Sequence, residues 1–590
     1  MTALLKVEGL TIGFGNAAPV VDDVSFSVDP GETLALVGES GSGKTLSCRA
    51  ALRILPAVAQ VRGGAVMLDG PDGPCDLMGL TERQMCYVRG NRVSMIFQEP
   101  MRSLSPLHRI GNQVIEVLRL HGTAKGQGAR KRVLETFERV GFKDPERIYG
   151  SYPFELSGGM RQRAMIAMAI VGKPDLLIAD EPTTALDVTT QAQVLGLIKE
   201  IQHETGMAMI LVTHDLGVVA NMADSVTVMN RGRVMEAGPA PLVLGSPQHG
   251  YTKELFAAAP MIPESSEQKA KDDGRDYILE MRNVSKTYTL KGKAPWHPKE
   301  HVYAVRGIEF GVERGKTLAV VGESGSGKTT CAHMALGAEW ADPGAEILFK
   351  PEKGAEAVNL QELGSADRLA FQRKAQMVFQ DPYSTLNPRM RVKDALCEPM
   401  EIHGLGTHGE RIERATEMLR WVGLSENMLT RYPHAFSGGQ RQRLSIARAL
   451  MLGPMFLVCD EPTSALDVSV QEQVLQLLEE IRDRLNLSYM FISHDLAVVA
   501  RIADEVAVMR EGLVIEQGPP EALFYSPQHP YTKALLAAQP EPDINRPIDL
   551  QTVSQGAGKP TTWPEAFRFD DVTIPPLLET SPGHKVRCHV

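Results

Sequence analysis

The stretch TLALVGESGSGKT at Thr33–Thr45 decides the fold of this chain, and TLAVVGESGSGKT repeats it at Thr317–Thr329. In both copies a short apolar run ends in glycine and leads directly into a glycine-rich loop. Such a run is typical of a buried parallel strand that feeds a helix. The two copies therefore predict two α/β units, each built on a parallel sheet.

The repeat extends far beyond this loop. Its offset falls from 284 residues at Gly38 and Gly322 to 280 at Glu181 and Glu461, and it stays at 280 through the closing segments SPQHGYTKELFAAAP and SPQHPYTKALLAAQP. One module of roughly 260 residues is thus duplicated, with small insertions only in its first half.

The repeat also sets the expected domain boundaries. We expect a first cassette at 1–260, a linker at 261–277, a second cassette at 278–540 and an extended tail at 541–590. The linker is polar and charged without apolar periodicity, which indicates a flexible tether. The tail is rich in Pro and Thr, which favours an extended segment on the surface or partial disorder.

Helical periodicity appears between the strands of each copy. ARKRVLETFERVGF places Val133, Phe137 and Val140 on one helical stripe. The equivalent stripe in RIERATEMLRWVGL consists of Ala415, Leu419 and Val422. Each parallel core is therefore expected to carry a mainly helical insertion.

Composition narrows the class of protein. The 590 residues include 62 Lys+Arg and 72 Asp+Glu, and the net charge of −10 gives no support for nucleic-acid binding. No run of about 18 apolar residues occurs, so no segment is expected to span a bilayer alone. The seven cysteines are scattered without a CxxC pair, which favours reduced cytosolic thiols over a zinc or disulfide framework.

The glycine-rich loops have the spacing GxxxxGK[ST], in which backbone N–H groups can point at phosphate oxygens. The lysine would neutralise the β and γ phosphates of a nucleotide, and the threonine would bind Mg²⁺. A glycine-rich surface turn is the alternative, which the preceding strands disfavour. The two predicted phosphate loops are Gly38, Glu39, Ser40, Gly41, Ser42, Gly43, Lys44 and Thr45, and Gly322, Glu323, Ser324, Gly325, Ser326, Gly327, Lys328 and Thr329.

Two further strands, LLIADE and FLVCDE, end in Asp-Glu. Asp180 and Asp460 suit the carboxylate that holds Mg²⁺ through water. Glu181 and Glu461 are then placed to orient or deprotonate an attacking water. An acidic strand end that only caps a helix is the alternative.

LSGGM at Leu156–Met160 and FSGGQ at Phe436–Gln440 resemble the signature motif of ATP-binding cassette (ABC) ATPases. The phosphate loop, glutamine strand, DEPT-ALD and T/S-HD motifs follow the order of that family. The resemblance implies an α/β fold of two P-loop NTPase cassettes, each a RecA-like parallel-sheet core with a helical subdomain. It also implies hydrolysis of ATP to ADP and phosphate with Mg²⁺.

In this family two cassettes meet head to tail, and each ATP lies between one copy's phosphate loop and the other copy's signature. By this resemblance one site joins Lys44, Gln98, Asp180, Glu181 and His214 with Ser437, Gly438, Gly439 and Gln440. The other joins Lys328, Gln380, Asp460, Glu461 and His494 with Ser157, Gly158 and Gly159.

The resemblance assigns further roles. Gln98 and Gln380 would sense Mg²⁺ and water, and His214 and His494 would contact the γ-phosphate. Phe14 and Tyr288 stand where the family stacks an aromatic ring on adenine, with ordinary packing as the alternative, and Asp187 and Asp467 stand in the loop that crosses to the opposite site. Met160 and Phe436 replace the usual signature residues without removing a phosphate ligand, so we expect two hydrolytic sites.

FQEPMRSLSP, FQDPYSTLNPRM and the SPQH closing segments resemble the oligopeptide/dipeptide/nickel import family. Two such cassettes on one chain resemble the fused peptide and glutathione import ATPases of bacteria. This implies the energy-coupling subunit of an importer at the cytoplasmic face of the inner membrane, with two membrane permease subunits and an extracytoplasmic solute-binding protein. A soluble two-cassette ABC protein acting on ribosomes or translation is the alternative, and an exporter ATPase is disfavoured. The sequence leaves the solute open.

Overall fold

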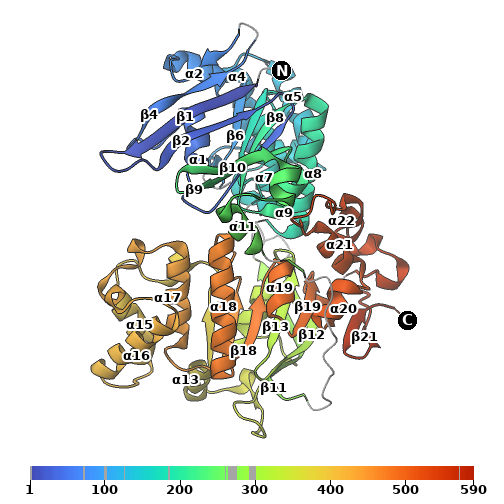
Figure 1. Ribbon diagram of the computed structural model, residues 1–590. Coiled ribbons are helices and arrows are strands. Elements are labelled where there is room, and N and C mark those ends of the chain that lie inside the picture. Colours follow the sequence, from blue (N-terminus) through green and yellow to red (C-terminus); the bar gives the residue numbers. More distant parts are fainter. Residues whose placement is uncertain are drawn as a thin grey trace. The chain divides into compact units, whose positions relative to one another are not determined.

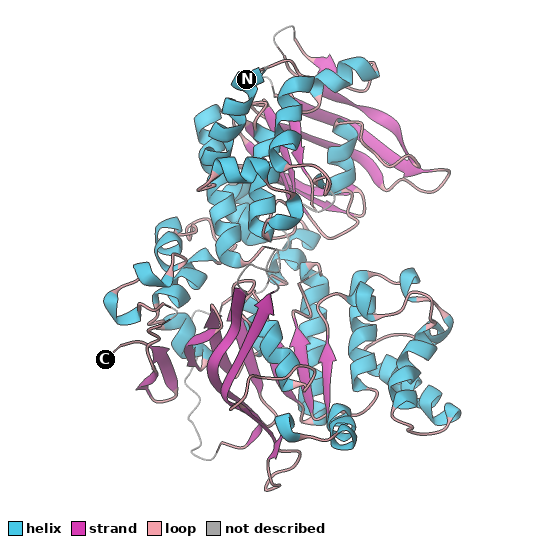
Figure 2. Ribbon diagram, turned by 180° about the vertical axis from the view of Figure 1, so that it is seen from behind, coloured by secondary structure: helices cyan, strands magenta, loops and turns pink. Residues whose placement is uncertain are grey.

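The chain, described here from a computed structural model, divides into two compact units. The first comprises Met1–Leu186, Thr190–Ala259 and Ala538–Leu550, and the second comprises Asp187–Thr189, Pro260–Ala537 and Gln551–Val590. In each unit helices flank the strands (Figure 2). The structure describes residues 3–70, 73–98, 103–124, 126–183, 186–259, 261–262, 275–290, 300–464, 466–570 and 572–589. Two segments lie outside the described residues: 263–274, which is most of the expected linker, and 99–102, which is part of the FQEPMRSLSP stretch after Gln98.

The core of the first unit is the predicted parallel sheet, which has the strand order β10-β9-β3-β8-β7-β6. The strands β9, β3, β8, β7 and β6 pair in parallel, and β10 closes one edge antiparallel to β9. The side chains of β3, β7 and β8 are buried throughout, as apolar runs in a sheet covered on both faces require. The strands are β3 (Thr33–Val37), β6 (Val93–Ile96), β7 (Leu176–Asp180), β8 (Ala208–Thr213), β9 (Ser225–Asn230) and β10 (Arg233–Pro239).

A second, antiparallel sheet packs on this core in the order β2-β1-β4-β5. One hydrophobic core contains Leu10 of β1, Val66 of β4, Leu36 of β3 and Ile210 of β8, so it joins the two sheets. The strands are β1 (Leu5–Phe14), β2 (Val21–Val28), β4 (Ala59–Leu68) and β5 (Cys75–Asp76).

The helical insertion predicted between the glutamine strand and the signature is confirmed by α4, α5 and α6, and the signature itself begins α7. Val133, Phe137 and Val140 are fully buried in a core formed by these helices and one face of the sheet. The helices of the unit are α1 (Lys44–Ala51), α2 (Glu82–Val88), α4 (Ile110–Leu120), α5 (Gly126–Arg139), α6 (Pro145–Gly150), α7 (Gly158–Ile170), α8 (Val188–Thr205), α9 (Leu216–Met222), α10 (Ala240–Gly245) and α11 (Gly250–Ala257).

The second unit repeats this architecture with a longer core sheet, in the order β16-β17-β18-β13-β19-β20-β22-β21, and an antiparallel sheet β12-β11-β14-β15 (Figure 1). The strands are β11 (Tyr277–Leu290), β12 (Glu300–Glu313), β13 (Thr317–Gly322), β14 (Glu346–Phe349), β15 (Val358–Asn359), β16 (Ala375–Val378), β17 (Phe456–Asp460), β18 (Ser488–Ile492), β19 (Glu505–Arg510), β20 (Leu513–Gly518), β21 (Leu577–Ser581) and β22 (His584–Arg587). The helices are α12 (Lys328–Ala335), α13 (Ser365–Lys374), α14 (Pro382–Thr385), α15 (Val392–Ile402), α16 (His408–Trp421), α17 (Gly438–Leu450), α18 (Val468–Leu485), α19 (Leu496–Ile502), α20 (Pro520–Tyr525), α21 (Pro530–Ala538) and α22 (Leu550–Gly556).

The expected extended tail at 541–590 is folded instead, and that expectation was wrong. The strands β21 and β22 form a hairpin that adds to the core sheet through β20, where Glu516 pairs with Val586. Trp563 is only 1% exposed and packs in a core with Phe569. Burial of these aromatic residues stabilises the segment, although its sequence shows little helical or strand periodicity.

Among the described residues no helix is both long enough and apolar enough to cross a membrane.

Candidate active sites

Both glycine-rich loops follow the central strand of their sheet and lead into a helix, as predicted. Gly38 follows β3 with φ of +147°, and a Cβ there would lie 2.1 Å from the Met229 carbonyl oxygen. At Gly322 φ is +148°, and a Cβ would lie 2.2 Å from the Met509 oxygen. Only glycine fits either position, because both the backbone conformation and the space exclude a side chain.

The loop lysines are buried inside the curve of their own loops. Lys44 Nζ donates hydrogen bonds to the Gly38 oxygen at 2.6 Å and the Glu39 oxygen at 2.9 Å. Lys328 Nζ repeats both bonds at 2.8 Å, and burial lowers its pKa. A cation at the start of a helix, inside a loop of backbone N–H groups, forms a site for an anion such as phosphate.

A hydroxyl and a carboxylate meet at the end of each loop. Thr45 Oγ1 donates to Asp180 Oδ1 at 2.8 Å, and Thr329 Oγ1 donates to Asp460 Oδ2 at 3.3 Å. Burial raises the pKa of both aspartates, which disfavours their charged form in the absence of a counterion.

The oxygens of this pair fit Mg²⁺. Asp180 Oδ2 is buried without a hydrogen-bond partner among the described residues, and Arg49 Nη2 lies 3.8 Å from it. Hydroxyl and carboxylate oxygens are the ligands that Mg²⁺ prefers. A divalent cation there would coordinate this oxygen and compensate the buried charge.

The glutamate after each of these aspartates is held by the predicted glutamine and histidine. Gln98 Nε2 donates to Glu181 Oε2 at 2.7 Å, and His214 Nδ1 lies 3.1 Å from Glu181 Oε1. The backbone of Glu181 is left-handed, with φ of +48°, which is uncommon for a residue other than glycine and is frequent at functional sites.

The second unit reproduces this arrangement. Gln380 Nε2 donates to Glu461 Oε2 at 2.8 Å, and His494 Nδ1 lies 3.2 Å from the same oxygen. Burial alone would raise the pKa of Glu461, but the hydrogen bond and charge of His494 hold that pKa below its ordinary value. An ionised carboxylate held by two side chains can orient a water molecule and accept its proton.

The signature motifs begin helices. Ser437 caps α17 in a reciprocal box, in which Gln440 N donates to Ser437 Oγ at 3.4 Å and Ser437 N donates to Gln440 Oε1 at 3.2 Å. Ser157 caps α7 and accepts from Met160 N at 3.4 Å, but methionine has no side-chain acceptor to return the bond. Each signature therefore presents the N–H groups of a helix N-terminus, and the first is less completely capped.

The remaining predicted residues lie on defined elements. Phe14 ends β1 and is half-buried, and Tyr288 lies in β11, where its hydroxyl donates to Glu339 Oε1 at 2.6 Å. Asp187 accepts from Thr189 Oγ1 at 2.8 Å, and Asp467 is the N-cap residue of α18. Each unit thus gathers its own loop, aspartate, glutamate, glutamine and histidine, whereas completion of each site by the other copy's signature stays a prediction.

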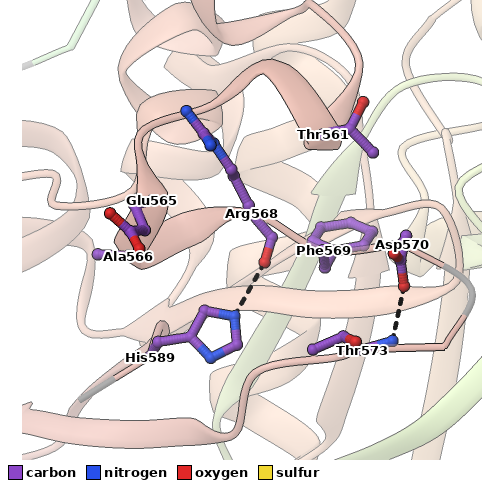
Figure 3. Close-up of a pocket in the computed structure, with 8 residues that line it drawn as sticks. All are labelled: Thr561, Glu565, Ala566, Arg568, Phe569, Asp570, Thr573 and His589. Carbon is purple, nitrogen blue, oxygen red and sulfur yellow. Dashed lines mark hydrogen bonds between the residues drawn. The ribbon is translucent and has the colours of Figure 1, made fainter.

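A surface pocket of about 850 Å³ lies in the tail, away from the predicted site residues (Figure 3). His589 Nε2 approaches the Arg568 oxygen at 3.1 Å across it, and Asp570 Oδ1 accepts from Thr573 N at 2.6 Å. Among the described residues no group of three or more His, Cys, Asp or Glu side chains could hold a metal ion. Both of these hydrogen bonds lie within the tail, and neither involves a predicted site residue.

Sequence reasoning missed two tyrosines that contact the phosphate loops. Glu39 N donates to Tyr251 Oη at 3.4 Å, and Glu323 N donates to Tyr531 Oη at 3.0 Å. Both tyrosines belong to the repeated SPQH closing segments, and that repetition was the available signal.

The fold and the sites define a tandem P-loop nucleotide hydrolase. Residues 21–184 and 305–464 match the ABC transporter family, and residues 515–569 match the oligopeptide/dipeptide transporter C-terminal region. The chain belongs to the ABC transporter family and is an ATPase with two ATP-binding cassettes.

The chain is similar over almost its full length to curated transport proteins. It is 44% identical to the peptidoglycan transport ATP-binding protein YejF of Agrobacterium fabrum, over 91% of this chain and 96% of that protein. It is 41% identical to the glutathione import ATP-binding protein GsiA of Escherichia coli O157:H7, over 99% of this chain and 96% of that protein.

Proposed function

We propose that this chain is the energy-coupling ATPase of a bacterial importer for short peptides or related solutes such as glutathione. The observation that supports this most strongly is the similarity to transport and import ATP-binding proteins over 91% and 99% of the chain. The C-terminal match to oligopeptide/dipeptide transporters agrees with it. Neither comparison supports the ribosome-associated alternative.

In the proposed mechanism each ATP binds to one phosphate loop and is covered by the signature of the other copy. Thr45 with Asp180, and Thr329 with Asp460, would hold Mg²⁺, which when bound offsets the charge of the β and γ phosphates. Lys44 and Lys328 neutralise the same phosphates.

Hydrolysis needs a positioned water. Glu181 and Glu461 accept its proton as its oxygen attacks the γ-phosphorus, the bond to the bridging oxygen breaks, and ADP and phosphate result. Gln98 and His214 hold the first carboxylate in place. The helix N-terminus of each signature stabilises the γ-phosphate only while it is present, so hydrolysis would weaken contact between the cassettes.

We further propose two membrane permease subunits and an extracytoplasmic solute-binding protein as partners. The chain would then act as a peripheral protein at the cytoplasmic face of the inner membrane. Both proposals follow from the transport function in the name of one relative and the import function in the name of the other.

The test begins with affinity purification of the full chain from detergent-solubilised membranes. Co-purifying subunits are identified by mass spectrometry and reconstituted with the chain in proteoliposomes. Uptake of a radiolabelled dipeptide, a tripeptide and glutathione is then measured with and without ATP. We expect ATP-dependent uptake of at least one of them, which the Glu181→Gln/Glu461→Gln double variant should abolish.

Two results would contradict the proposal. One is co-sedimentation of the chain with ribosomes instead of membranes. The other is a purified complex without integral membrane subunits.

A further inference from the structure

The tyrosine of each closing segment reaches the phosphate loop of its own cassette. The N–H of Glu323, the second residue of the loop, donates to Tyr531 Oη at 3.0 Å. In the first cassette the equivalent Glu39 N–H donates to Tyr251 Oη at 3.4 Å. In each cassette, the N–H that follows the first glycine of the loop is thus bound by a tyrosine about 200 positions away in the chain.

In the second cassette a chain of hydrogen bonds holds this tyrosine. Glu516 on β20 accepts from Gln528 N at 2.8 Å and from His529 N at 3.1 Å. His529 Nδ1 in turn accepts from Tyr531 N at 3.1 Å. His529 must be neutral to accept this bond, and burial lowers its pKa to about 3.

The first cassette repeats the chain bond for bond. Glu236 on β10 accepts from Gln248 N at 2.8 Å and from His249 N at 3.0 Å. His249 Nδ1 accepts from Tyr251 N at 3.2 Å. Two independent copies of the same connection, from a sheet glutamate to the phosphate loop, indicate a built feature of the cassette.

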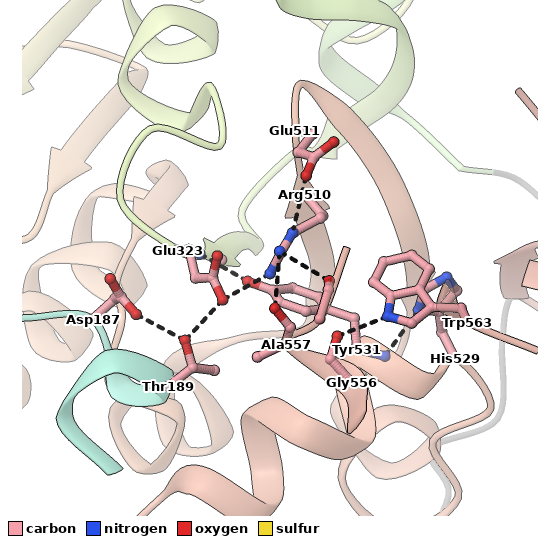
Figure 4. A network of polar contacts seen from close by, with 12 residues as sticks. Asp187, Thr189, Glu323, Arg510, Glu511, His529, Tyr531, Gly556, Ala557 and Trp563 are labelled. Carbon is pink, nitrogen blue, oxygen red and sulfur yellow. Dashed lines mark hydrogen bonds and ion pairs between the residues drawn. The ribbon is translucent and has the colours of Figure 1, made fainter. Parts of the chain in front are cut away.

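The two copies differ in what covers them. In the second cassette, the Trp563 ring of the tail packs edge-on against the His529 ring, with 4.8 Å between the ring centroids, and Tyr531 is fully buried. Arg510 lies over the Tyr531 ring at 4.7 Å and pairs with Glu323 Oε1 at 2.7 Å (Figure 4).

The tail also makes polar contacts with two members of this network. Arg510 Nη2 donates to the Ala557 oxygen at 3.2 Å, and His584 of the tail hairpin lies 2.8 Å from Glu516 Oε1. In the first cassette, by contrast, His249 is exposed and Tyr251 is half-buried.

We propose that Tyr251 and Tyr531 are positioning residues for ATP binding, and that the folded tail strengthens the second of these contacts. Each tyrosine fixes one N–H of the phosphate loop, so the loop is held in its binding conformation before the nucleotide arrives. Pre-organisation of this kind lowers the cost of binding. The proposal rests on ATP binding by the two cassettes and is independent of the solute imported.

Tyr531→Phe tests this with minimal disturbance, because it removes only the hydroxyl. The matched control is Tyr525→Phe, on an exposed ring of α20 in the same unit. Both are made in the full chain on a Glu181→Gln background, so that hydrolysis reports the site of Glu461. Amide hydrogen exchange of the peptide 319–328 is measured without nucleotide, and KM for ATP and kcat are measured in the same preparations.

We expect faster exchange at 319–328 and a KM raised about three- to tenfold in Tyr531→Phe, as for loss of one net hydrogen bond, with kcat within about twofold. Tyr525→Phe should change neither quantity. Trp563→Phe, which loses the 3.0 Å bond from Nε1 to the Gly556 oxygen, should raise exchange at 319–328 by less.

Tyr251→Phe on a Glu461→Gln background provides an independent second test, with a smaller expected effect because its hydrogen bond is longer and more exposed. The proposal is overturned if exchange at the phosphate loop stays at the control value in Tyr531→Phe. It is also overturned if kcat falls while KM is unchanged. Wild-type ATP hydrolysis, measured alongside, separates failure of this proposal from failure of the ATPase function itself.

Discussion

Replacing Glu181 or Glu461 with glutamine tests whether the chain contains two working hydrolytic sites. Glu181 lies 2.7 Å from Gln98 Nε2 and 3.1 Å from His214 Nδ1, and the second copy repeats these distances at 2.8 and 3.2 Å around Glu461. Glutamine keeps the size of the side chain but cannot take a proton from water. Loss of a general base costs about 10²–10⁴-fold at the affected site.

The near-identical geometry predicts equal contributions from the two sites. Each single variant should therefore keep about half of the wild-type rate if the sites act independently, and less if they are coupled. The double variant should keep less than about 1%. Phosphate release is measured with the full chain, and binding of a fluorescent ATP analogue confirms that each variant still binds nucleotide.

Glu426→Gln is the control, because Glu426 is an exposed residue that forms an ion pair with the surface residue Arg420 of the same unit. Its rate should equal the wild-type rate. A single variant at Glu181 or Glu461 with unchanged phosphate release would refute the reasoning, because one of the two carboxylates would then have no role in turnover.

The other predictions concern the loop, the pH dependence and the signature. Gly38→Ala should abolish ATP binding by the first loop in a titration, because the added Cβ would lie 2.1 Å from a carbonyl oxygen. Gly41→Ala has open space around its Cβ but a φ of +78°, so it should destabilise the loop conformation by only about 1–2 kcal/mol. Burial opposes the charge on His494, yet the hydrogen bond that it donates to Glu461 raises its pKa above 6.5 and holds the pKa of Glu461 below 4.5. The pair therefore stabilises the fold most between about pH 4.5 and 6.5. The loss of Tm in His494→Gln should accordingly be largest near pH 5.5 and shrink as pH rises through the His494 pKa or falls through that of Glu461; a pH-independent loss would contradict this. Met160→Gln should complete the capping box of α7 and stabilise the first unit by about 0.5 kcal/mol in denaturant unfolding, and an unchanged midpoint would show that the box does not form.

The parts of the fold that could be predicted from sequence are those with local periodicity. The apolar runs before Gly38 and Gly322 became the central strands β3 and β13, and the stripe of Val133 and Phe137 became the buried face of α5. In each case the periodicity of the segment itself indicates which side chains are buried. The Glu181–Gln98 contact was likewise predictable, because the carboxyl ends of adjacent parallel strands bring their following residues together.

The tail could not be predicted in this way. Its order depends on single residues such as Trp563 and Arg587, whose partners lie far away in the chain: Arg587 Nε donates to the Val514 oxygen at 2.7 Å, 73 positions earlier. The Pro and Thr content of the tail carried no information about these distant contacts. The hairpin exists because the edge strand β20 offers unpaired backbone groups that β22 can satisfy.

The internal duplication provides a control that one cassette alone would not. Where the copies agree, as in the connection from Glu236 or Glu516 to the phosphate loop, the shared contacts survive different surroundings and point to a common requirement of ATP binding. The copies differ next to the loop. In the second copy Arg510 forms an ion pair with Glu323, whereas the first copy has Asn230 at the position equivalent to Arg510. The proposed catalytic carboxylates, Glu181 and Glu461, are matched in geometry, so any inequality between the two sites should appear in nucleotide affinity before it appears in the chemical step.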